Sequence, residues 1–404
     1  MTAIPTSSNR YRVAVTGLGV ACPIGTSIEE YQSSLILGQS GIRPIESMDV
    51  TGLSTTVAAE TQLNPDYLPE CGDRKARFMY WAADKAYTMA FKSHPYKPED
   101  GLLSLGIGLD LFSLPELVHS FHHTGLEGDP HYYIPASSMV PSLTKHYKCH
   151  QPPQIVLSAC AASSDALGLA LDSIRSGQSL WSLAGGTDSM INPMGFAAFS
   201  ILGAMSRRNS PQSSRPFDKY RDGFVMGEGA GAIILERYDL AEKRGATILG
   251  ELLGHGGSMD AYAISDPDPE GKGAGIAMEK AILDAGLTPD KIQYINAHGT
   301  STPKNDVAET NAIKRVFHNP PPVSSTKSMI GHCIASAGVL EVIAVFLAQG
   351  KDYLPPTINL ENPDPACDLD YIPNRARGQA IEYFLSNSLA FGGQNSSLVG
   401  RIIR

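Results

Sequence analysis

The chain has 404 residues, of which 42% are hydrophobic and 18% are charged, and its formal net charge at pH 7 is −9. This is the composition of a soluble globular enzyme with a sizeable core, and the negative charge argues against non-specific nucleic-acid binding. No apolar run approaches the roughly 20 residues that a membrane helix requires, and the short polar start of the chain is not a secretory signal. We therefore expect no membrane or nucleic-acid partner.

Predicted strands and helices alternate along the chain. Residue patterns predict a strand at 11–16, helices at 27–37 and 82–90, a strand at 155–157, a helix at 162–175, strands at 182–184, 231–236 and 248–254, a helix at 276–285, a strand at 292–295, a helix at 307–317, a strand at 323–325, a helix at 336–349 and a strand at 397–402. This order predicts an α/β protein in which helices cover parallel sheets.

Glycines follow the first predicted strand. Gly17-Leu18-Gly19 resembles the start of a dinucleotide-binding fingerprint, but the third glycine is missing and no acidic residue follows at the required distance. Residues 11–19 and 248–256 both read as a strand that runs into glycines, which suggests an internal duplication. Arg244-Gly245-Ala246 is the candidate junction, so we divide the chain into halves at 1–247 and 248–404.

The six cysteines, at positions 22, 71, 149, 160, 333 and 367, are scattered. None has the paired spacing of a zinc site, and the scatter suits reduced thiols in the cytoplasm. His122-His123 and the group His146, Cys149 and His150 are too isolated to predict a metal site. We therefore expect a cytoplasmic protein without a metal ion.

Cys160 lies where the strand predicted at 155–157 gives way to the helix predicted at 162–175, in the run Val-Leu-Ser-Ala-Cys-Ala-Ala-Ser-Ser-Asp. The unpaired N–H groups and the dipole at a helix N-terminus favour a thiolate. The small neighbouring residues leave room for a substrate carbonyl. A buried, inert cysteine is the alternative interpretation.

Two histidines follow predicted strands in loops rich in Gly, Ser and Thr. His298 lies in Asn-Ala-His-Gly-Thr-Ser-Thr-Pro, and His332 ends Ser-Ser-Thr-Lys-Ser-Met-Ile-Gly-His. The C-terminal ends of strands are where α/β folds place reactive groups. Each histidine alone could be an imidazole of the surface or the core with no catalytic role. Together with Cys160, however, the set would supply one nucleophile and two groups that form hydrogen bonds or transfer protons.

These motifs resemble those of the Cys-His-His ketosynthases, above all β-ketoacyl-acyl-carrier-protein synthase II and its polyketide relatives. The resemblance extends to residues 12–19, 215–236 and 355–363 and to Ala-Phe-Gly-Gly-Gln-Asn at 390–395, and it is weak at about 44–135. It implies the duplicated thiolase fold, in which helices and sheets alternate in five layers (αβαβα). It also implies a decarboxylative Claisen condensation of malonyl-acyl-carrier protein with an acyl chain on Cys160, in fatty-acid or polyketide (including polyene) synthesis.

The resemblance assigns roles to the residues around Cys160. Neutral His298 and His332, each protonated at Nε2, would stabilise the enolate oxygen. Lys327 resembles the structural and electrostatic lysine of the family and could pair with Glu309 in the substrate site. Phe391 resembles the gatekeeping aromatic residue, and its N–H and that of Cys160 would bind the oxyanion of acyl transfer. Asn296, Glu341 and Ser386 align with positions that hold a structural cation in some relatives, but we predict no ion from them.

Further residues are expected to bind the carrier protein. Thr300 and Thr302 resemble residues that hydrogen-bond the phosphopantetheine arm, and no other cofactor is implied. Arg74, Lys75 and Arg208 are candidates for docking an acidic carrier protein, although a solvated helix face explains them equally well.

The segment 95–135, which contains Ile107 and Leu109–Phe112, is unlike the housekeeping enzymes of the family. By resemblance it lines the acyl pocket and the dimer interface, so Ile107 is a candidate substrate contact. We expect an obligate dimer, either a homodimer or a heterodimer with a ketosynthase-like chain-length factor. Two other functions stay open: a non-catalytic chain-length-factor-like scaffold, which usually lacks the cysteine, and a coenzyme A-dependent thiolase, which carries a Cys-His-Cys set.

Overall fold

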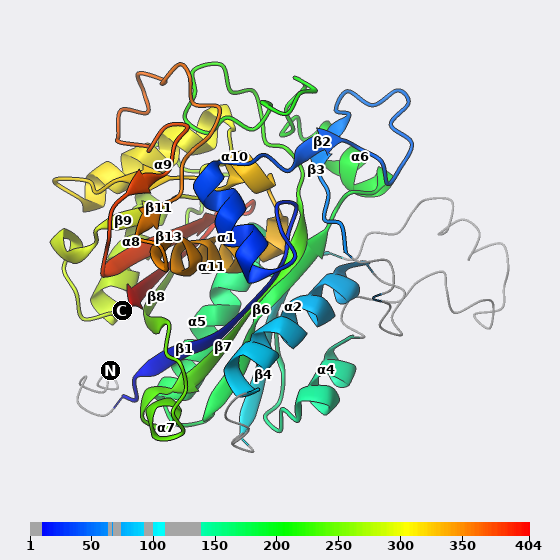
Figure 1. Ribbon diagram of the computed structural model, residues 1–404. Helices are drawn as coiled ribbons and strands as arrows, with labels where there is room; N and C mark the ends of the chain where they lie inside the picture. Colours follow the sequence, from blue (N-terminus) through cyan, green and yellow to red (C-terminus); the bar gives the residue numbers. More distant parts are fainter. Residues whose placement is uncertain (1–9, 64–66, 68–73, 93–99, 110–138) are drawn as a thin grey trace, which may run out of the picture.

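The computed structural model describes residues 10–63, 67, 74–92, 100–109 and 139–404 (Figure 1). In these ranges the helices are α1 (Ile28–Leu37), α2 (Arg74–Phe91), α4 (Met139–Tyr147), α5 (Ala162–Arg175), α6 (Pro193–Ile201), α7 (Tyr238–Lys243), α8 (Lys272–Asp284), α9 (Pro303–Val316), α10 (Lys327–Ile330) and α11 (Ala337–Gln349). Short 3₁₀ helices, which we call η3 (Ala159–Ala161), η4 (Pro289–Lys291) and η5 (Ile334–Ser336), join some of the elements.

Most strands belong to one large sheet. Its members are β1 (Val13–Ala21), β4 (Gly101–Ile107), β5 (Gln154–Val156), β6 (Trp181–Ser189), β7 (Glu228–Arg237), β8 (Gly250–Met259), β9 (Tyr294–Asn296), β10 (Val323–Ser324), β13 (Tyr383–Leu389) and β14 (Gln394–Ile402). Two small ribbons pair β2 (Ile42–Pro44) with β3 (Val57–Ala59) and β11 (Tyr353–Leu354) with β12 (Arg377–Gly378).

The large sheet consists of two halves with the same topology. Its order is β10-β9-β13-β14-β8-β1-β7-β6-β4-β5, so the halves meet where β8 pairs with β1. In each half three neighbouring strands are parallel, the fourth (β7 or β14) is antiparallel to both of its neighbours, and the innermost strand (β1 or β8) runs in the same direction as the first three. The expected duplication is therefore confirmed. The prediction of purely parallel sheets is wrong, because one strand in each half, β7 in the first and β14 in the second, runs against the others, and alternation along the chain does not reveal it. The division at 247/248 falls between α7 and β8 and stays a prediction.

Helices form the other three layers (Figure 1). α5 and α11 pack between the two halves and contact strands of both. α2 covers the outer face of the first half, and α8 with α9 covers the outer face of the second. The result is the five-layered αβαβα arrangement that the resemblance implied. Among the described residues, no helix combines the length and apolar character needed to cross a membrane.

Paired glycines allow the outer helices to lie directly on the first strand of each half. A Cβ at Gly17 or Gly19 would come within 2.2 Å of a carbonyl oxygen of α2, and a Cβ at Gly254 or Gly256 would lie 2.2 Å from a carbonyl oxygen of α8. Close helix packing therefore explains the Gly17-x-Gly19 pattern. The same Gly-x-Gly pattern recurs on β8, which is evidence of the duplication at the level of the sequence.

Substitution of Gly256 by alanine is expected to destabilise the fold. The new methyl group would overlap the α8 backbone, which cannot move away as a flexible side chain could, so the cost should be at least about 1–3 kcal/mol. Gly257→Ala on the same strand is the matched control, because its Cβ would meet only an atom 3.9 Å away. Urea unfolding of both variants measures the difference, and equal midpoints would contradict this account of the packing.

Candidate active site

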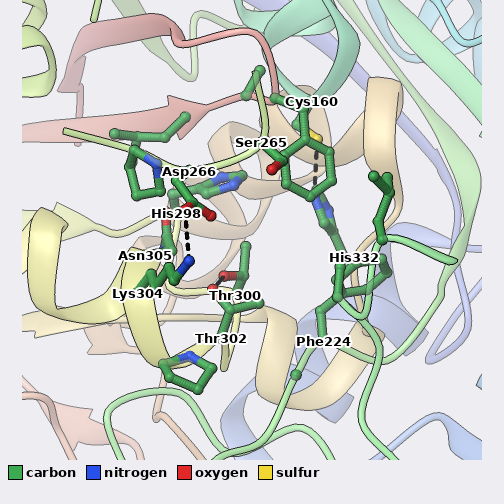
Figure 2. Close-up of a pocket in the computed structure, with 18 of the residues that line it drawn as sticks. Cys160, Phe224, Ser265, Asp266, His298, Thr300, Thr302, Lys304, Asn305 and His332 are labelled. Atoms are coloured by element: carbon green, nitrogen blue, oxygen red, sulfur yellow. Dashed lines mark hydrogen bonds and ion pairs between the residues drawn. The ribbon is translucent and has the colours of Figure 1, made fainter. Parts of the chain in front are cut away.

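A cavity of about 280 Å³ lies at the C-terminal ends of the sheet strands (Figure 2). Its lining includes Cys160 from the turn after β5, His298 from the loop after β9, His332 from the loop after β10 and Phe391 from the loop after β13. The first residue comes from the N-terminal half of the chain and the others from the C-terminal half. The fold therefore brings together the four residues that the motifs placed far apart.

Cys160 occupies a tight strand-to-helix turn. It lies in η3, between β5 and α5, and its side chain is buried. The preceding residue, Ala159, has a φ of +48°, a left-handed conformation that is unfavourable for a residue with a side chain. Phe391 lines the same cavity, and its backbone N–H is near enough to the Cys160 sulfur to lower the pKa of the thiol.

His332 is oriented by hydrogen bonds at both ring nitrogens. Its Nε2 lies 3.1 Å from the Cys160 Sγ, and its Nδ1 accepts the backbone N–H of Ile334 at 3.3 Å (Figure 2). Because Nδ1 accepts, the hydrogen of the neutral ring is on Nε2, which points toward the sulfur. The His298 ring lies edge-to-face against His332, with centroids 5.2 Å apart. The structure thus supplies the partner that the sequence could not identify for His332.

Burial determines the protonation states in the cavity. Burial, and then the nearby Lys327 ammonium, holds the pKa of both His298 and His332 well below the usual range, so both imidazoles are neutral at pH 7. Burial also raises the pKa of the Cys160 thiol to about 12, although Lys327 and the N–H of Phe391 oppose the increase. The helix terminus favours a thiolate, as the sequence indicated, but loss of solvation outweighs it and the resting sulfur is a thiol.

The sequence suggested that Lys327 pairs with Glu309, and this prediction is wrong. The Lys327 Nζ forms a fully buried ion pair with Glu341 of α11. Glu309 lies behind the His298 loop, where its two carboxylate oxygens accept the backbone N–H groups of His298 and Gly299 at 2.8 Å each. Glu309 is therefore not among the residues that line the cavity, and it holds the loop that carries His298.

Six buried side chains have polar atoms without a partner in the part of the chain that the structure describes, and three of them are the residues that align with the cation site of some relatives. They are the side-chain amide of Asn296, the second carboxylate oxygen of Glu341 and the hydroxyl of Ser386. Asn296 and Ser386 are opposite each other on the paired strands β9 and β13. Such oxygen donors fit a hard cation, which would stabilise this end of the site and take no part in bond making.

The two threonines predicted to hold the phosphopantetheine arm share the cavity, and their role in binding that arm stays a prediction. Thr300 and Thr302 line the cavity, and their hydroxyls are 2.9 Å apart (Figure 2). Ile107 instead packs in the hydrophobic core beneath α2 and is not among the cavity-lining residues. Asp110–Phe112, which were expected beside it, lie outside the described residues.

The three residues proposed to dock the carrier protein differ in their exposure to solvent. Lys75 is buried and donates to the carbonyl of Leu109, so it cannot meet a partner on the surface of this chain. Arg74 is half-buried and forms an ion pair with buried Glu228. Arg208 is exposed. The three residues were selected for charge alone, and charge does not reveal which side chains fold inward.

The sequence analysis missed the aromatic wall of the site. The Phe224 ring lies edge-to-face against His332 with centroids 5.4 Å apart, and Phe199 contacts both Phe224 and Phe391. Phe224 belongs to the run Arg-Asp-Gly-Phe that supported the resemblance but received no role. Phe224 and Phe391 line the cavity, and Phe199 packs behind both.

A buried thiol and two neutral imidazoles in one cavity, on a duplicated five-layered fold, define a Cys-His-His condensing enzyme. Residues 10–241 match the protein-family model described as "Beta-ketoacyl synthase, N-terminal domain". Residues 249–361 match the model described as "Beta-ketoacyl synthase, C-terminal domain". The chain belongs to the β-ketoacyl synthase family and is a condensing acyltransferase.

Relatives agree with this assignment. A protein of Synechocystis sp. named 3-oxoacyl-[acyl-carrier-protein] synthase 2 is 41% identical over 96% of this chain and 97% of its own. A putative polyketide beta-ketoacyl synthase 1 of Streptomyces cyaneus is 34% identical over 96% and 97%. Among solved structures, a beta-ketoacyl synthase from Burkholderia phymatum superposes with a TM-score of 0.88 at 32% identity, covering 98% of this chain and all of that one. The thiolase and scaffold alternatives are not favoured.

Alkylation of Cys160 should depend on pH as a buried thiol does. A pKa raised to about 12 keeps the sulfur protonated at neutral pH, so the rate of reaction with iodoacetamide should increase about tenfold per pH unit up to about pH 10. Peptide-resolved mass spectrometry measures the rate at this cysteine. A plateau with a midpoint below the usual thiol range would show that the helix terminus overcomes burial after all.

Proposed function

We propose that the protein carries an acyl chain on Cys160 and condenses it with a malonyl group delivered by an acyl carrier protein. The observation that carries the proposal is the 3.1 Å contact between Cys160 Sγ and the Nε2 of His332, with the His298 ring beside it. A nucleophile for one thioester and two neutral N–H donors for the other are what this reaction requires.

In the first half-reaction, the Cys160 sulfur attacks the carbonyl carbon of an acyl-carrier thioester. The N–H groups of Cys160 and Phe391 bind the oxyanion as it forms. When the tetrahedral intermediate collapses, the carrier thiolate leaves and takes up the proton that the Cys160 thiol has lost. The products are the acyl-enzyme and a free carrier thiol, so no external base is consumed.

In the second half-reaction, malonyl-carrier protein loses CO₂ and the negative charge moves to its thioester oxygen. The Nε2–H groups of His298 and His332 bind that oxygen, since acylation of Cys160 frees His332 from the sulfur. The enolate carbon then attacks the acyl carbonyl, the bond between that carbon and the Cys160 sulfur breaks, and the released thiolate takes up one proton from solvent, so each condensation consumes one proton. Thr300 and Thr302 hold the phosphopantetheine arm along the cavity wall.

Further support for a carrier-protein partner comes from relatives. One solved structure with a TM-score of 0.86 is described as a type II polyketide acyl-carrier protein in complex with its ketosynthase. In this chain the exposed Arg208 follows Leu202–Ala204, which line the cavity. We propose that Arg208 meets acidic groups of the carrier protein and that Arg74 does not. In the described part of the chain no disulfide joins the cysteines, which suits the proposed cytoplasmic location.

The first test of this function is the site of acylation. Incubation with an acyl-carrier thioester should add one acyl mass, and peptide mapping should place it on Cys160. Cys160→Ser should abolish condensation while the protein stays folded, and Cys149→Ser, at a buried cysteine outside the cavity, should retain condensation. An adduct on another cysteine would contradict the assignment.

The second test separates the half-reactions. Cys160→Gln should still release CO₂ from malonyl-carrier protein, because the sulfur does not contact the enolate. His298→Ala and His332→Ala should each slow this release by about 10²-fold or more, the usual cost of losing one oxyanion donor. The exposed His318→Ala is the control and should have no effect. Undiminished CO₂ release from both histidine variants would mean that their roles are wrong.

We also propose that the enzyme is an obligate dimer that associates through β5. Each terminal strand of the sheet pairs with one neighbour among the described residues, but β10 is buried, whereas Ile155 in β5 is 39% exposed and Leu157, just after this strand, is 65% exposed. An open strand edge with apolar side chains is a site for pairing with another chain. The partner is a second copy or, as in a solved ketosynthase/chain length factor structure with a TM-score of 0.86, a related subunit.

Leu157→Glu should shift the native mass toward the monomer and abolish condensation, because a buried charge at the strand edge opposes pairing. Leu283→Glu is the matched control: this leucine on α8 is 77% exposed and far from β5 in the sheet order. Analytical ultracentrifugation of the purified chain also distinguishes a homodimer from a chain that needs a second subunit. Full activity in a wild-type monomer would overturn the proposal.

A further inference from the structure

A hydrogen-bond network lies directly beneath the nucleophile turn. The Ser158 hydroxyl, two residues before Cys160, donates to the Asp165 Oδ2 at 2.6 Å. The other oxygen of Asp165 lies 3.2 Å from the His255 Nε2, which in turn lies 3.1 Å from the Ser396 hydroxyl. Ser158 and Asp165 come from the N-terminal half, whereas His255 on β8 and Ser396 on β14 come from the C-terminal half.

The turn that carries Cys160 has a strained backbone, so it requires contacts that hold it in place. Ala159 has a φ of +48°, which a residue with a side chain adopts only when its surroundings impose it. The backbone supplies one constraint, because the Ala161 N–H donates to the Ser158 carbonyl at 3.0 Å. The Ser158 side chain supplies the other through Asp165, which lies in the first turn of α5.

The charge on Asp165 is stable at neutral pH. Burial raises the pKa of this carboxyl, but hydrogen bonds from His255, Ser158 and Ser396 outweigh burial and bring the pKa below its usual range. A hydrogen bond to an ionised acceptor is stronger than one between neutral groups. The contact from Ser158 to Asp165 is therefore suited to holding a strained turn.

We propose that Asp165 is a positioning residue for Cys160: through Ser158 it holds the strained turn so that the sulfur faces the N–H of Phe391 and the Nε2 of His332. Because its second oxygen is bound to the C-terminal half, Asp165 also fixes the nucleophile relative to the half that carries both histidines. Asp165 itself contacts no reacting atom. The inference rests on the proposed acyl transfer to Cys160.

The role separates the two half-reactions. Acyl transfer depends on the position of the sulfur, and small displacements of a reacting atom cost roughly ten-fold to 10²-fold in rate. Decarboxylation of malonyl-carrier protein depends on His298 and His332 and not on the Ser158 turn. Loss of Asp165 should therefore slow the first and leave the second unchanged.

The experiment is a double-mutant cycle on Ser158→Ala and Asp165→Ala, with Asp172→Ala on the exposed face of α5 as the control. The single-turnover rate of Cys160 acylation is followed by intact mass, and CO₂ release from malonyl-carrier protein is measured on the same preparations. Each single variant should acylate roughly ten-fold more slowly, the double variant should be no slower than Asp165→Ala, and CO₂ release should match wild type.

Other outcomes would overturn the inference. Wild-type rates of acylation in Asp165→Ala would show that the turn needs no anchor. A defect in Asp165→Ala with none in Ser158→Ala would show that the charge acts without Ser158. Equal losses of acylation and CO₂ release would indicate general damage to the fold. If wild-type protein itself fails to acylate Cys160, the proposed function fails and not this inference alone.

Discussion

The active site depends on the close packing of two equivalent strand-to-helix turns. In the first half β5 leads through η3 to α5, and in the second β10 is followed by α10 and then by η5 and α11. Ala159 and Ile334, which begin η3 and η5, have φ values of +48° and +45°. The helices after them meet so closely that a Cβ on Gly338 would lie 2.0 Å from the Ser164 hydroxyl. This contact between the halves brings the sulfur of one turn to the imidazole that precedes the other.

The contact between the two halves is buried, and burial determines which groups in the active site carry a charge. The site holds a neutral thiol and two neutral imidazoles because burial disfavours their charged forms, while Lys327 is the cation near all three. Glu341 neutralises Lys327 within the core. At the sulfur and the two imidazoles, charge therefore develops only with the substrate, as an oxyanion or an enolate, and the buried N–H donors face it.

Much of this could be predicted from sequence, and the rest fails for definable reasons. Helix α5 begins and ends where its periodicity indicates, and the motifs around Cys160, His298 and His332 identified the residues that share the cavity. The predicted direction was wrong for β7 and β14, because the residues of a strand do not reveal which neighbour it pairs with or in which direction. Lys327 was given the wrong partner and Lys75 the wrong environment, since ion pairing and burial depend on distant segments.

The tautomers of the two active-site histidines test the central claim most directly. ¹⁵N NMR of histidine-labelled protein, assigned with single His→Ala variants, reports which ring nitrogen carries the hydrogen. His298 and His332 should both be neutral and protonated at Nε2 between pH 6 and pH 8. An imidazolium at either position, or a hydrogen on Nδ1 of His332, would contradict the claim that two neutral Nε2–H groups await the enolate.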